Sequence, residues 1–347
     1  MSARPFGRWI ACLILFGVGC TLPARLEPAA RIAVSNSWLA MGTFFEIEIR
    51  VEPANEEIAR SFVAWARDEI PRLEKIYSRH DPESELETLN RSLANDSILV
   101  SGVHVEAELE RLLFAGIEVW EGSGGAFDMT IGPLVEVWID GVTDGRWPSV
   151  AELRGAKAKI GSEAFLLLGN GEFEVLKTGM QIDLDGISKG AVLDHLRRRF
   201  ELDLPNAAAL LNFGESSIVA IGDPDGNGWR LEIRSRGALA EDSNVIYLRD
   251  QALGVSSSLG TVSAIAGERV SQVIDPRTGS IVRSGVEAIV IADRAVLADG
   301  WSTALLVVGA NRTALRLLEK VGLEANVLES TGRTISTEGW ERALAQP

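Results

Sequence analysis

The chain has 347 residues, of which 49 are acidic and 34 are basic, so its formal net charge at pH 7 is −15. This charge excludes a nucleic-acid binder that works through a basic face, because such binding depends on cations that displace phosphate counterions. It also argues against an anionic membrane surface as the main partner. With 46% hydrophobic and 24% charged residues, the chain has the composition of a globular protein with a core of its own.

The N-terminus has the pattern of an export signal. Arg4 and Arg8 precede an apolar run at 9–19, which is too short to span a bilayer as a helix. Small residues then lead to Cys20, as in the cleavage box of bacterial lipoproteins, although Gly17 replaces the usual large aliphatic residue. We expect an exported protein that a lipid on Cys20 anchors to the membrane, facing the periplasm or the cell exterior. A plain secretory signal and an uncleaved anchor are the alternatives.

The two cysteines agree with export and limit the chemistry. Cys12 lies inside the signal and Cys20 would carry the lipid, so the mature chain has no thiol for a nucleophile, a zinc–thiolate site or an iron–sulfur cluster. Because the chain holds only three histidines, we expect any catalytic metal to be a hard cation bound by oxygen. The predicted organisation is a lipoprotein-type signal peptide at 1–19, a tether at 20–36 and one folded domain at 37–347.

Hydrophobic periodicity predicts the elements of the folded domain in chain order. Alternation predicts a strand at 45–51, and helical spacing predicts helices at 58–76, with a kink at Pro71, and at 109–120. Further helices are predicted at 187–200, 295–308 and 311–321, and further strands at 173–176, 180–184, 208–213, 217–221, 229–233, 244–248 and 286–292. Because strands mostly follow strands, we expect an α+β fold rather than a doubly wound sheet.

Residues 186–190 match the G-x-S-x-G pattern of a hydrolase nucleophile elbow, placed between a predicted strand and a predicted helix. A serine hydrolase of this kind also needs an acid and a histidine far downstream of the serine. The only histidine after Ser188 is His195, which lies on the same predicted helix, too close in sequence to fold back onto the serine. We therefore reject the serine-hydrolase hypothesis.

The same segment is better explained as a site for a phosphorylated ligand with a divalent cation. Asp183 and Asp185 alternate with apolar residues, so both carboxylates would leave the predicted strand on one face. Gly186 lets the backbone approach a ligand closely, and the helix N-terminus that follows offers N–H groups to an anion. Lys189 adds a cation there. The structural alternative is a carboxylate–lysine salt bridge that closes a strand–helix turn.

Three further segments combine turn chemistry with candidate ligands. The glycine loop at 124–130 could wrap a planar ligand, with Asp128 as a cap, or it could be a helix C-cap followed by a turn. Residues 272–279 read as a strand ending in a proline turn, for which a tight corner is the alternative. Asp299 and Thr303 share one face of a predicted helix and offer two oxygens to a hard cation, unless they form only an N-terminal cap with a buried threonine.

Taken together, these segments resemble the ApbE family of FAD:protein FMN transferases. They occur in the family's order and cover roughly residues 38–330. The matching segments are Met41–Thr43, Ser84–Leu86 with Leu89–Asn90, Gly125–Thr130, Asp183–Gly190, Asn212–Gly214, Asp275–Gly279 and Ala298–Thr303. The resemblance implies a single domain of mixed, largely antiparallel sheets with flanking helices and a cleft for FAD.

The resemblance also implies a Mg²⁺-dependent transfer of FMN from FAD to a threonine hydroxyl of an acceptor protein, with release of AMP. The acceptor would carry an S/T-G-A-T-like motif, typically in a respiratory electron-transfer subunit. The implied metal ligands are Asp299, Thr303 and the backbone carbonyl of Gly186, with Ser302 at a position where many relatives carry a third carboxylate. The implied FAD contacts are Met41, His80, Ala126, Phe127, Asp128, Asp183, Lys189 and Val273.

Two departures from the family pattern bear on binding and catalysis. His80 stands where relatives commonly have an aromatic residue, and its imidazole could stack on a flavin ring. Gln272 stands where relatives usually have a histidine, the candidate base for the incoming hydroxyl, and glutamine cannot take up a proton at neutral pH. The role must therefore pass to another group or be lost. The available carboxylates are Asp183, Asp185 and Asp275.

Three hypotheses remain at this point. The first, which we favour, is a working flavin transferase with an altered base. The second is a Mg²⁺-dependent FAD pyrophosphatase that releases FMN and AMP, and the third is a non-catalytic flavin-binding lipoprotein. The presence of Asp299, Thr303 and Lys189 favours the first two hypotheses, because a mere binder need not keep metal chemistry.

Overall fold

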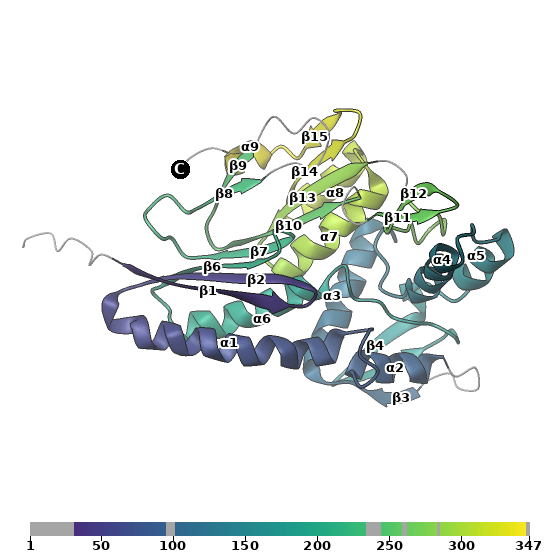
Figure 1. Cartoon of the computed structure of the whole chain (residues 1–347), viewed down its shortest axis with the longest axis horizontal. Coiled ribbons are helices and arrows are strands. Elements are labelled where there is room, and N and C mark those ends of the chain that lie inside the picture. Colours follow the sequence, from purple (N-terminus) through teal and green to yellow (C-terminus); the bar gives the residue numbers. More distant parts are fainter. Residues whose placement is uncertain (1–30, 95–100, 234–243, 259–261, 283–284, 345–347) are drawn as a thin grey trace, which may run out of the picture. The chain divides into compact units, whose positions relative to one another are not determined.

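An eight-stranded antiparallel sheet lies at the centre of the fold (Figure 1). The computed structural model describes residues 31–94, 101–233, 244–258, 262–282 and 285–344. Along β2, the alternation of buried Phe45, Ile47 and Ile49 with more exposed residues turns one face of the strand to the core. In spatial order, the strands of this sheet are β1 (Ile32–Ala40), β2 (Thr43–Val51), β6 (Ala208–Phe213), β7 (Ser217–Ile221), β10 (Gln251–Ser257), β13 (Val286–Ala292), β14 (Glu324–Glu329) and β15 (Thr334–Ser336).

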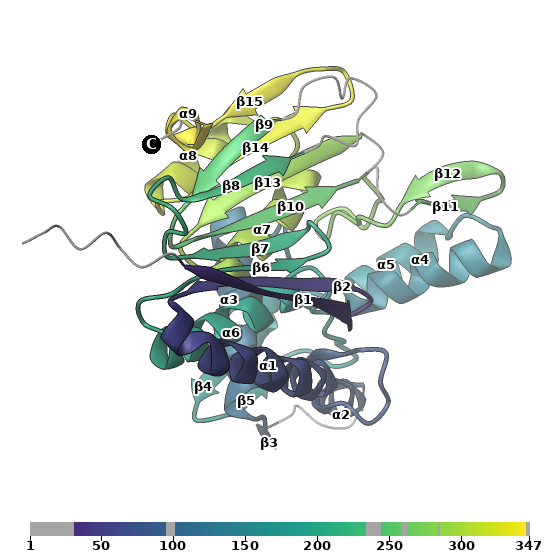
Figure 2. The same cartoon turned by 60° about the vertical axis from the view of Figure 1, so that its left-hand side comes forward.

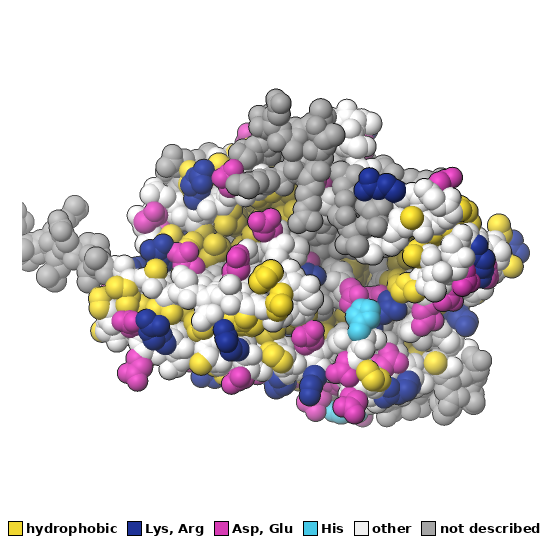
Figure 3. Space-filling model, viewed as in Figure 1, with side chains coloured by type: hydrophobic (Ala, Val, Ile, Leu, Met, Phe, Trp, Pro, Cys, Tyr) yellow, Lys and Arg dark blue, Asp and Glu magenta, His cyan; other side chains and the backbone are white. Residues whose placement is uncertain are grey.

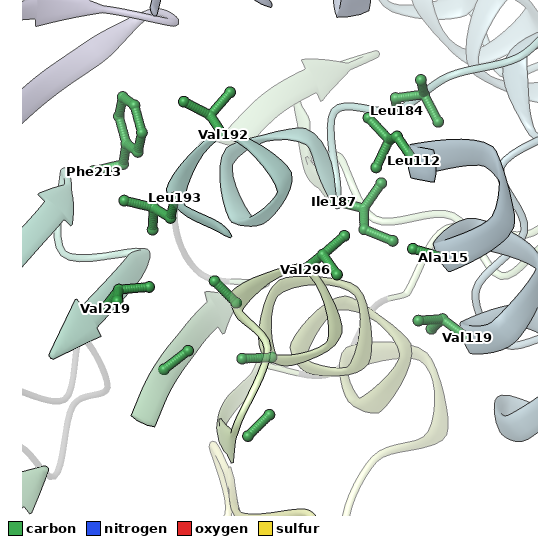
Figure 4. Close-up of a cluster of buried hydrophobic side chains, with 14 of the residues drawn as sticks. Leu112, Ala115, Val119, Leu184, Ile187, Val192, Leu193, Phe213, Val219 and Val296 are labelled. Carbon is green, nitrogen blue, oxygen red and sulfur yellow. The ribbon is translucent and has the colours of Figure 1, made fainter. Parts of the chain in front are cut away.

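Helices cover one face of this sheet, and the largest hydrophobic core lies between them and the strands (Figures 1 and 2). In Figure 4, Ile187 lies close to Val119 and Val296, which come from two of these helices. The packing is tight, since a Cβ added at Gly300 would lie 3.0 Å from Val119 Cγ2 and 3.1 Å from Ile187 Cδ1. The helices of this layer are α1 (Glu56–Tyr77), α3 (Ala107–Ser123), α6 (Ser188–Asp203), α7 (Ala295–Val308) and α8 (Arg312–Lys320).

Smaller elements complete the fold. A second core, which contains Trp229 and Trp340, joins the other face of the sheet to β8 (Trp229–Ile233), β9 (Asn244–Leu248) and α9 (Trp340–Leu344). Beside α2 (Glu85–Leu93), a three-stranded sheet has the order β3 (Ser101–His104), β5 (Glu172–Val175) and β4 (Phe165–Gly169). Two short 3₁₀ helices occupy Pro53–Asn55 and Ser162–Ala164.

A projecting arm carries one side of the candidate site. It consists of two helices and a hairpin that lie side by side in both views (Figures 1 and 2). A third core, in which Trp138 packs with Val270 and Ile274, holds these pieces together. The elements of the arm are α4 (Gly132–Asp144), α5 (Val150–Lys157), β11 (Val262–Ile265) and β12 (Glu268–Ser271).

The predicted α+β fold with largely antiparallel sheets and flanking helices is confirmed. The strands predicted at 208–213, 217–221, 229–233, 244–248 and 286–292 and the helix predicted at 295–308 coincide with observed elements. Helix α1 runs without interruption through Pro71, where we predicted a kink. Within the described residues, no helix is both long and apolar enough to cross a membrane.

Two predictions are wrong. Residues 32–36 of the predicted tether belong to β1, which pairs with β2 from Ile32 opposite Val51 to Ala40 opposite Thr43. Most side chains of this edge strand are exposed, so it has no apolar pattern. The predicted strand at 180–184 has one β-bridge, between Gln181 and Ile131, because a side chain replaces a partner strand there. The predicted signal at 1–19 and the tether up to residue 30 lie outside the described residues.

Candidate functional site

A cavity of about 570 Å³ opens between the arm, the loop after α1 and segment 183–186. Figure 3 shows a hollow on this face of the molecule where histidine, acidic and basic side chains border apolar ones. One side of the cavity, the polar wall, is formed by Arg79, His80, Asp183, Asp185, Gly186 and Thr303. The other side, the apolar wall, is formed by Ile131, Val135, Trp138, Ile139, Val142, Val270, Ile274 and Ile281.

Segment 181–186 is fixed by hydrogen bonds to side-chain and backbone groups. The side chain of Asn90 accepts from Ile182 N at 2.7 Å and donates to Ile182 O at 3.0 Å, as a neighbouring strand would. The amide of Asp183 donates to Met129 O at 2.8 Å. Because the segment is extended, Asp183 and Asp185 both reach the cavity, as the alternation in the sequence predicted.

Arg79 forms the most enclosed ion pair of the polar wall. Its Nη1 lies 2.5 Å from Asp183 Oδ2, and each side chain is only about a tenth exposed. Burial raises the pKa of Asp183 and the nearby charge of Asp185 adds to this effect, whereas Arg79 opposes it. The polar wall therefore holds a guanidinium that is committed to one carboxylate but remains next to the open cavity.

His80 and Asp185 form a second, more exposed pair at the mouth of the cavity. The His80 Nε2 atom lies 3.5 Å from Asp185 Oδ2, and the side chains are 72% and 59% exposed. The backbone of this loop is ordered locally, because His80 N donates to Ser78 Oγ and Ser84 Oγ donates to Ser78 O. Ser84 is fully buried and also caps α2.

Asp299 lies deeper, at the junction of α6, α7 and β7. Its carboxylate accepts hydrogen bonds from Gly190 N at 2.9 Å and from Ser217 Oγ at 3.0 Å. Burial raises the pKa of Asp299, and the positive charge of Lys189 opposes that shift. Only glycine fits at position 190, since a Cβ there would lie 2.4 Å from Ala295 O. Neither Asp299 nor Lys189 lines the cavity.

The predicted metal ligands are only partly brought together. Thr303 Oγ1 lies 3.3 Å from Gly186 O and 3.4 Å from Asp299 O, and both Thr303 and Gly186 line the cavity. Ser302 is fully buried, and its hydroxyl bonds instead to Asp299 O and Ser256 Oγ. The described residues contain no cluster of three or more His, Cys, Asp or Glu side chains arranged for a metal.

The donor set nevertheless fits a hard cation. The Thr303 hydroxyl and the Gly186 carbonyl are neutral oxygens at the cavity surface, and the Asp299 carboxylate is one helical turn before Thr303. A carboxylate has about four lone-pair positions, of which the bonds from Gly190 and Ser217 use two. Oxygen ligands of these kinds suit Mg²⁺.

Asp128 joins the glycine loop to Ser162, the first residue of the second 3₁₀ helix. Its carboxylate accepts from Thr130 N and Thr130 Oγ1 at 2.9 and 2.6 Å, and from Ser162 Oγ at 2.7 Å. The side chain is only 6% exposed, yet Asp128 also lines the cavity. The helix C-cap that the sequence offered as an alternative is present, since Gly124 is the left-handed C-cap of α3, and Ala126, Phe127 and Asp128 of the same loop line the cavity.

Ten of the fifteen predicted site residues line the cavity, and five do not. Met41 lies in the turn between β1 and β2. Asp275 accepts hydrogen bonds within its own turn and pairs with Arg277 at 2.9 Å. The residues that line the cavity are His80, Ala126, Phe127, Asp128, Asp183, Asp185, Gly186, Gln272, Val273 and Thr303, and those outside it are Met41, Lys189, Asp275, Asp299 and Ser302.

Sequence reasoning missed Arg79 and the whole apolar wall. Arg79 is 104 positions from its partner Asp183, and only the fold joins them. The apolar wall residues have the spacing of ordinary core positions on α4, so their pattern alone does not distinguish a ligand surface from a core. The available signal was its position directly before His80, which was a predicted site residue.

The sheet order, the helical layer and the cavity beside the arm define a mixed α/β fold with an enclosed polar and apolar site. The chain belongs to the ApbE family, whose model matches residues 41–327. It is 27% identical to a protein of Klebsiella pneumoniae named FAD:protein FMN transferase, covering 94% of this chain and 92% of the relative. A relative of that name from Escherichia coli K12 is 26% identical, covering 93% and 92%.

Solved structures share the fold over most of the chain. A crystal structure of the ApbE protein of Thermotoga maritima has a TM-score of 0.79 and 25% identity, and the match covers 91% of this chain and all of that one. The apo form of the Pseudomonas stutzeri flavinyl transferase ApbE has a TM-score of 0.75 at 22% identity, covering 93% of this chain and all of that one. At that identity the second likeness supports the fold alone.

Proposed function

We propose that this protein is a transferase that moves FMN from FAD to an acceptor protein and releases AMP. Membership of the ApbE family and the names of the curated relatives support this function. The observation that carries it is the two-sided cavity, in which a polar wall suited to a pyrophosphate adjoins an apolar wall suited to flat aromatic rings. A site with both surfaces accommodates the two chemical parts of a dinucleotide.

In this proposal, each wall of the cavity binds a different part of FAD. The apolar wall receives a ring of FAD, and Phe127 and Val273 extend that surface. On the polar wall, Arg79 is positioned to neutralise pyrophosphate oxygens while Asp183 holds its guanidinium in place. Of the FAD contacts implied by the family, Met41 and Lys189 would have to act from outside the cavity as it stands, whereas His80, Ala126, Phe127, Asp128, Asp183 and Val273 line it.

The metal in this proposal is Mg²⁺, held by Asp299, Thr303 and the carbonyl oxygen of Gly186. When bound, such an ion offsets the negative charge that builds up on phosphate oxygens during phosphoryl transfer. The chain's own contribution is to position these ligands. The α6–α7 junction fixes Asp299 through Gly190 and Ser217, and the first turns of α7 place Thr303 beside Gly186.

The acceptor and the location are further parts of the proposal. A threonine hydroxyl in an S/T-G-A-T-like motif of a respiratory electron-transfer subunit is the expected acceptor. The N-terminal pattern that ends at Cys20 supports a lipid-anchored protein outside the cytoplasmic membrane. A location outside that membrane would give the enzyme access to exported acceptor domains.

The test uses the full-length protein with FAD, Mg²⁺ and a peptide that contains the threonine motif. We expect the peptide to gain the mass of one FMN and AMP to appear in equal amount. Production of AMP and free FMN without labelled peptide would favour the pyrophosphatase, and intact bound FAD would favour a non-catalytic flavin binder.

Thr303→Val tests the metal part of the proposal separately. Loss of the hydroxyl removes one proposed ligand, so transfer should require a higher Mg²⁺ concentration, by about 10-fold or more. Thr313→Val is the matched control, because Thr313 is an exposed residue of α8. An unchanged Mg²⁺ requirement in Thr303→Val would remove Thr303 from the ligand set.

A further inference from the structure

Gln272 lines the cavity but cannot act as a base for an incoming hydroxyl. The carboxylates that could replace it are constrained in different ways. Asp275 pairs with Arg277 and does not line the cavity, and Asp183 is held in its ion pair with Arg79. Asp128 is only 6% exposed and accepts hydrogen bonds from Thr130 and Ser162. The groups left at the mouth of the cavity are Asp185 and His80, which pair with each other.

We infer that His80 is the general base of this protein and that Asp185 positions its imidazole. This inference rests on the proposed function. Among the described residues that line the cavity, His80 is the only imidazole, and it lies at the mouth, where a hydroxyl on another protein would arrive. Asp185 lies 3.5 Å from His80 Nε2, so it favours a ring whose Nε2 carries the proton and whose Nδ1 is free to accept one.

The loop around His80 is built to hold this side chain at the mouth. Ser78 accepts from the backbone N–H of His80, and the buried Ser84 bonds to the Ser78 carbonyl. The imidazole pairs with Asp185, and the charge of the neighbouring Arg79 is paired with Asp183. The two pairs therefore have different roles. The enclosed Arg79–Asp183 pair supplies a guanidinium beside the cavity, and the exposed His80–Asp185 pair supplies the imidazole that accepts the proton.

The chemical step balances with no further reactant. The acceptor hydroxyl oxygen forms a bond to the phosphorus of the FMN half of FAD, while that phosphorus loses its bond to the bridging oxygen. The bridging oxygen leaves on AMP with the electron pair of the broken bond. The hydroxyl proton passes to Nδ1 of His80 and from there to solvent, which the 72% exposure of the side chain allows.

The decisive variant is His80→Ala in the full-length protein, with transfer to the threonine peptide measured at saturating FAD. We expect the maximal transfer rate to fall by about 10²–10⁴-fold. The dissociation constant for FAD, followed by flavin fluorescence, should rise by a much smaller factor than the maximal rate falls, because any change in affinity reports only the flavin contact of His80. His104→Ala is the matched control, since His104 is an exposed histidine outside the cavity.

Two rescue measurements distinguish a base from a structural residue. Free imidazole should restore much of the rate in His80→Ala, because the variant leaves an open space at the mouth, and it should leave His104→Ala unchanged. The second change Gln272→His should also restore part of the transfer in the His80→Ala background, because it places another imidazole in the cavity lining. A residue that only shapes the loop would respond to neither.

The results separate this inference from the proposed function. If the unmodified protein labels no peptide, the proposed transferase function fails. If the unmodified protein transfers FMN and His80→Ala does so at the same rate, His80 is not the base. A rate loss that is fully explained by weaker FAD binding would equally overturn the inference and make His80 a flavin contact. His80→Asn repeats the test with a side chain of similar size if the alanine variant folds poorly.

Discussion

The polar and apolar walls of the cavity differ in how the protein holds them. On the polar wall, Asp183 and Asp185 are set by a short extended segment that hydrogen bonds fix to Asn90 and Met129, so a few specific contacts define the geometry. On the apolar wall, Val135 and Ile139 are presented by α4, which is fixed by packing within the arm. The polar wall therefore depends on individual hydrogen bonds, whereas the apolar wall depends on distributed packing contacts.

Breaking the Arg79–Asp183 pair should have the largest effect. Asp183→Asn or Arg79→Met leaves one enclosed group without its charge partner, and such losses typically cost about 3–5 kcal/mol of the free energy of unfolding. In Arg79→Met, removal of the cation that opposes the raised pKa of Asp183 should raise that pKa further. Urea unfolding of both variants measures the loss.

The double variant Arg79→Met/Asp183→Asn tells whether the cost belongs to the pair. With both charges gone, no unpaired ion is left, so we expect the double variant to be more stable than the sum of the single changes predicts, by about 0.5–3 kcal/mol. FMN transfer should be lost in all three variants. Strict additivity in unfolding would mean that the polar wall does not depend on this contact.

The next largest effect is expected from a change at Asp128, which belongs to neither wall and anchors the glycine loop at 124–130. Asp128→Ala leaves the buried donors of Thr130 and Ser162 without an acceptor, at a cost of about 2–3 kcal/mol. Asp140→Ala is the control, because Asp140 is exposed on α4. Urea unfolding at equal pH measures the difference, and equal stability of the two variants would contradict the anchoring role.

The same contrast explains what the sequence could predict. Strands such as β6 and β7 and helix α7 follow their apolar patterns, because packing decides their positions. Asp183 and Asp185 were predictable because alternation fixes which way neighbours point. In contrast, the Arg79–Asp183 pair depends on a fold that joins residues 104 positions apart, and no local pattern contains it.

The two structural errors have the same origin. Segment 180–184 looks like a strand from its alternation, but its partner is the side chain of Asn90, which periodicity does not reveal. Conversely, Ile32–Asn36 has little alternation and still forms part of β1, because backbone hydrogen bonds to β2 require no particular side chains. In both cases hydrogen bonds to a neighbour, and not the apolar pattern of the segment itself, decide the structure.

A smaller effect is expected for Ile139, which tests the distributed character of the apolar wall. Ile139 is 50% exposed and lines the cavity, so Ile139→Ala removes contact with a bound ring but little core. Three carbons at about 0.8 kcal/mol per buried CH₂ set an upper limit near 2 kcal/mol, and partial exposure brings the expected loss to about 1 kcal/mol, or roughly 5-fold in FAD affinity.

Flavin fluorescence titration measures this loss, with Val150→Ala as the control. Val150 is 73% exposed on α5 and does not line the cavity, so its truncation should leave FAD affinity unchanged. The maximal transfer rate of Ile139→Ala should also stay constant, because the contact is the same before and during the reaction. A drop in maximal rate without weaker binding would mean that the apolar wall takes part in the chemistry.

The smallest expected effect concerns His195, which contrasts with the exposed His80 because it is enclosed between α6 and α1. Its Nε2 lies 2.8 Å from Glu69 Oε1, and its ring stacks on Trp65. Burial lowers the pKa of His195 below its usual value near 6.5, and Arg72 and Arg198 add to this effect, whereas Glu69 opposes it. Below about pH 6.5 the unfolded chain therefore takes up a proton that the folded chain does not, so stability contributed by neutral His195 is lost as the pH falls.

Other groups in the protein titrate as well, so the test compares the unmodified protein with a His195 variant. Burial gives Asp194 and Glu85 raised pKa values, which favour the folded state at low pH and act in the opposite direction. Urea unfolding of the unmodified protein and of His195→Gln at pH 8 and pH 5.5 cancels these shared contributions. The unmodified protein should lose more stability than the variant between the two pH values. An equal loss would mean that His195 takes up its proton as readily in the folded chain as in the unfolded one, and would contradict the lowered pKa.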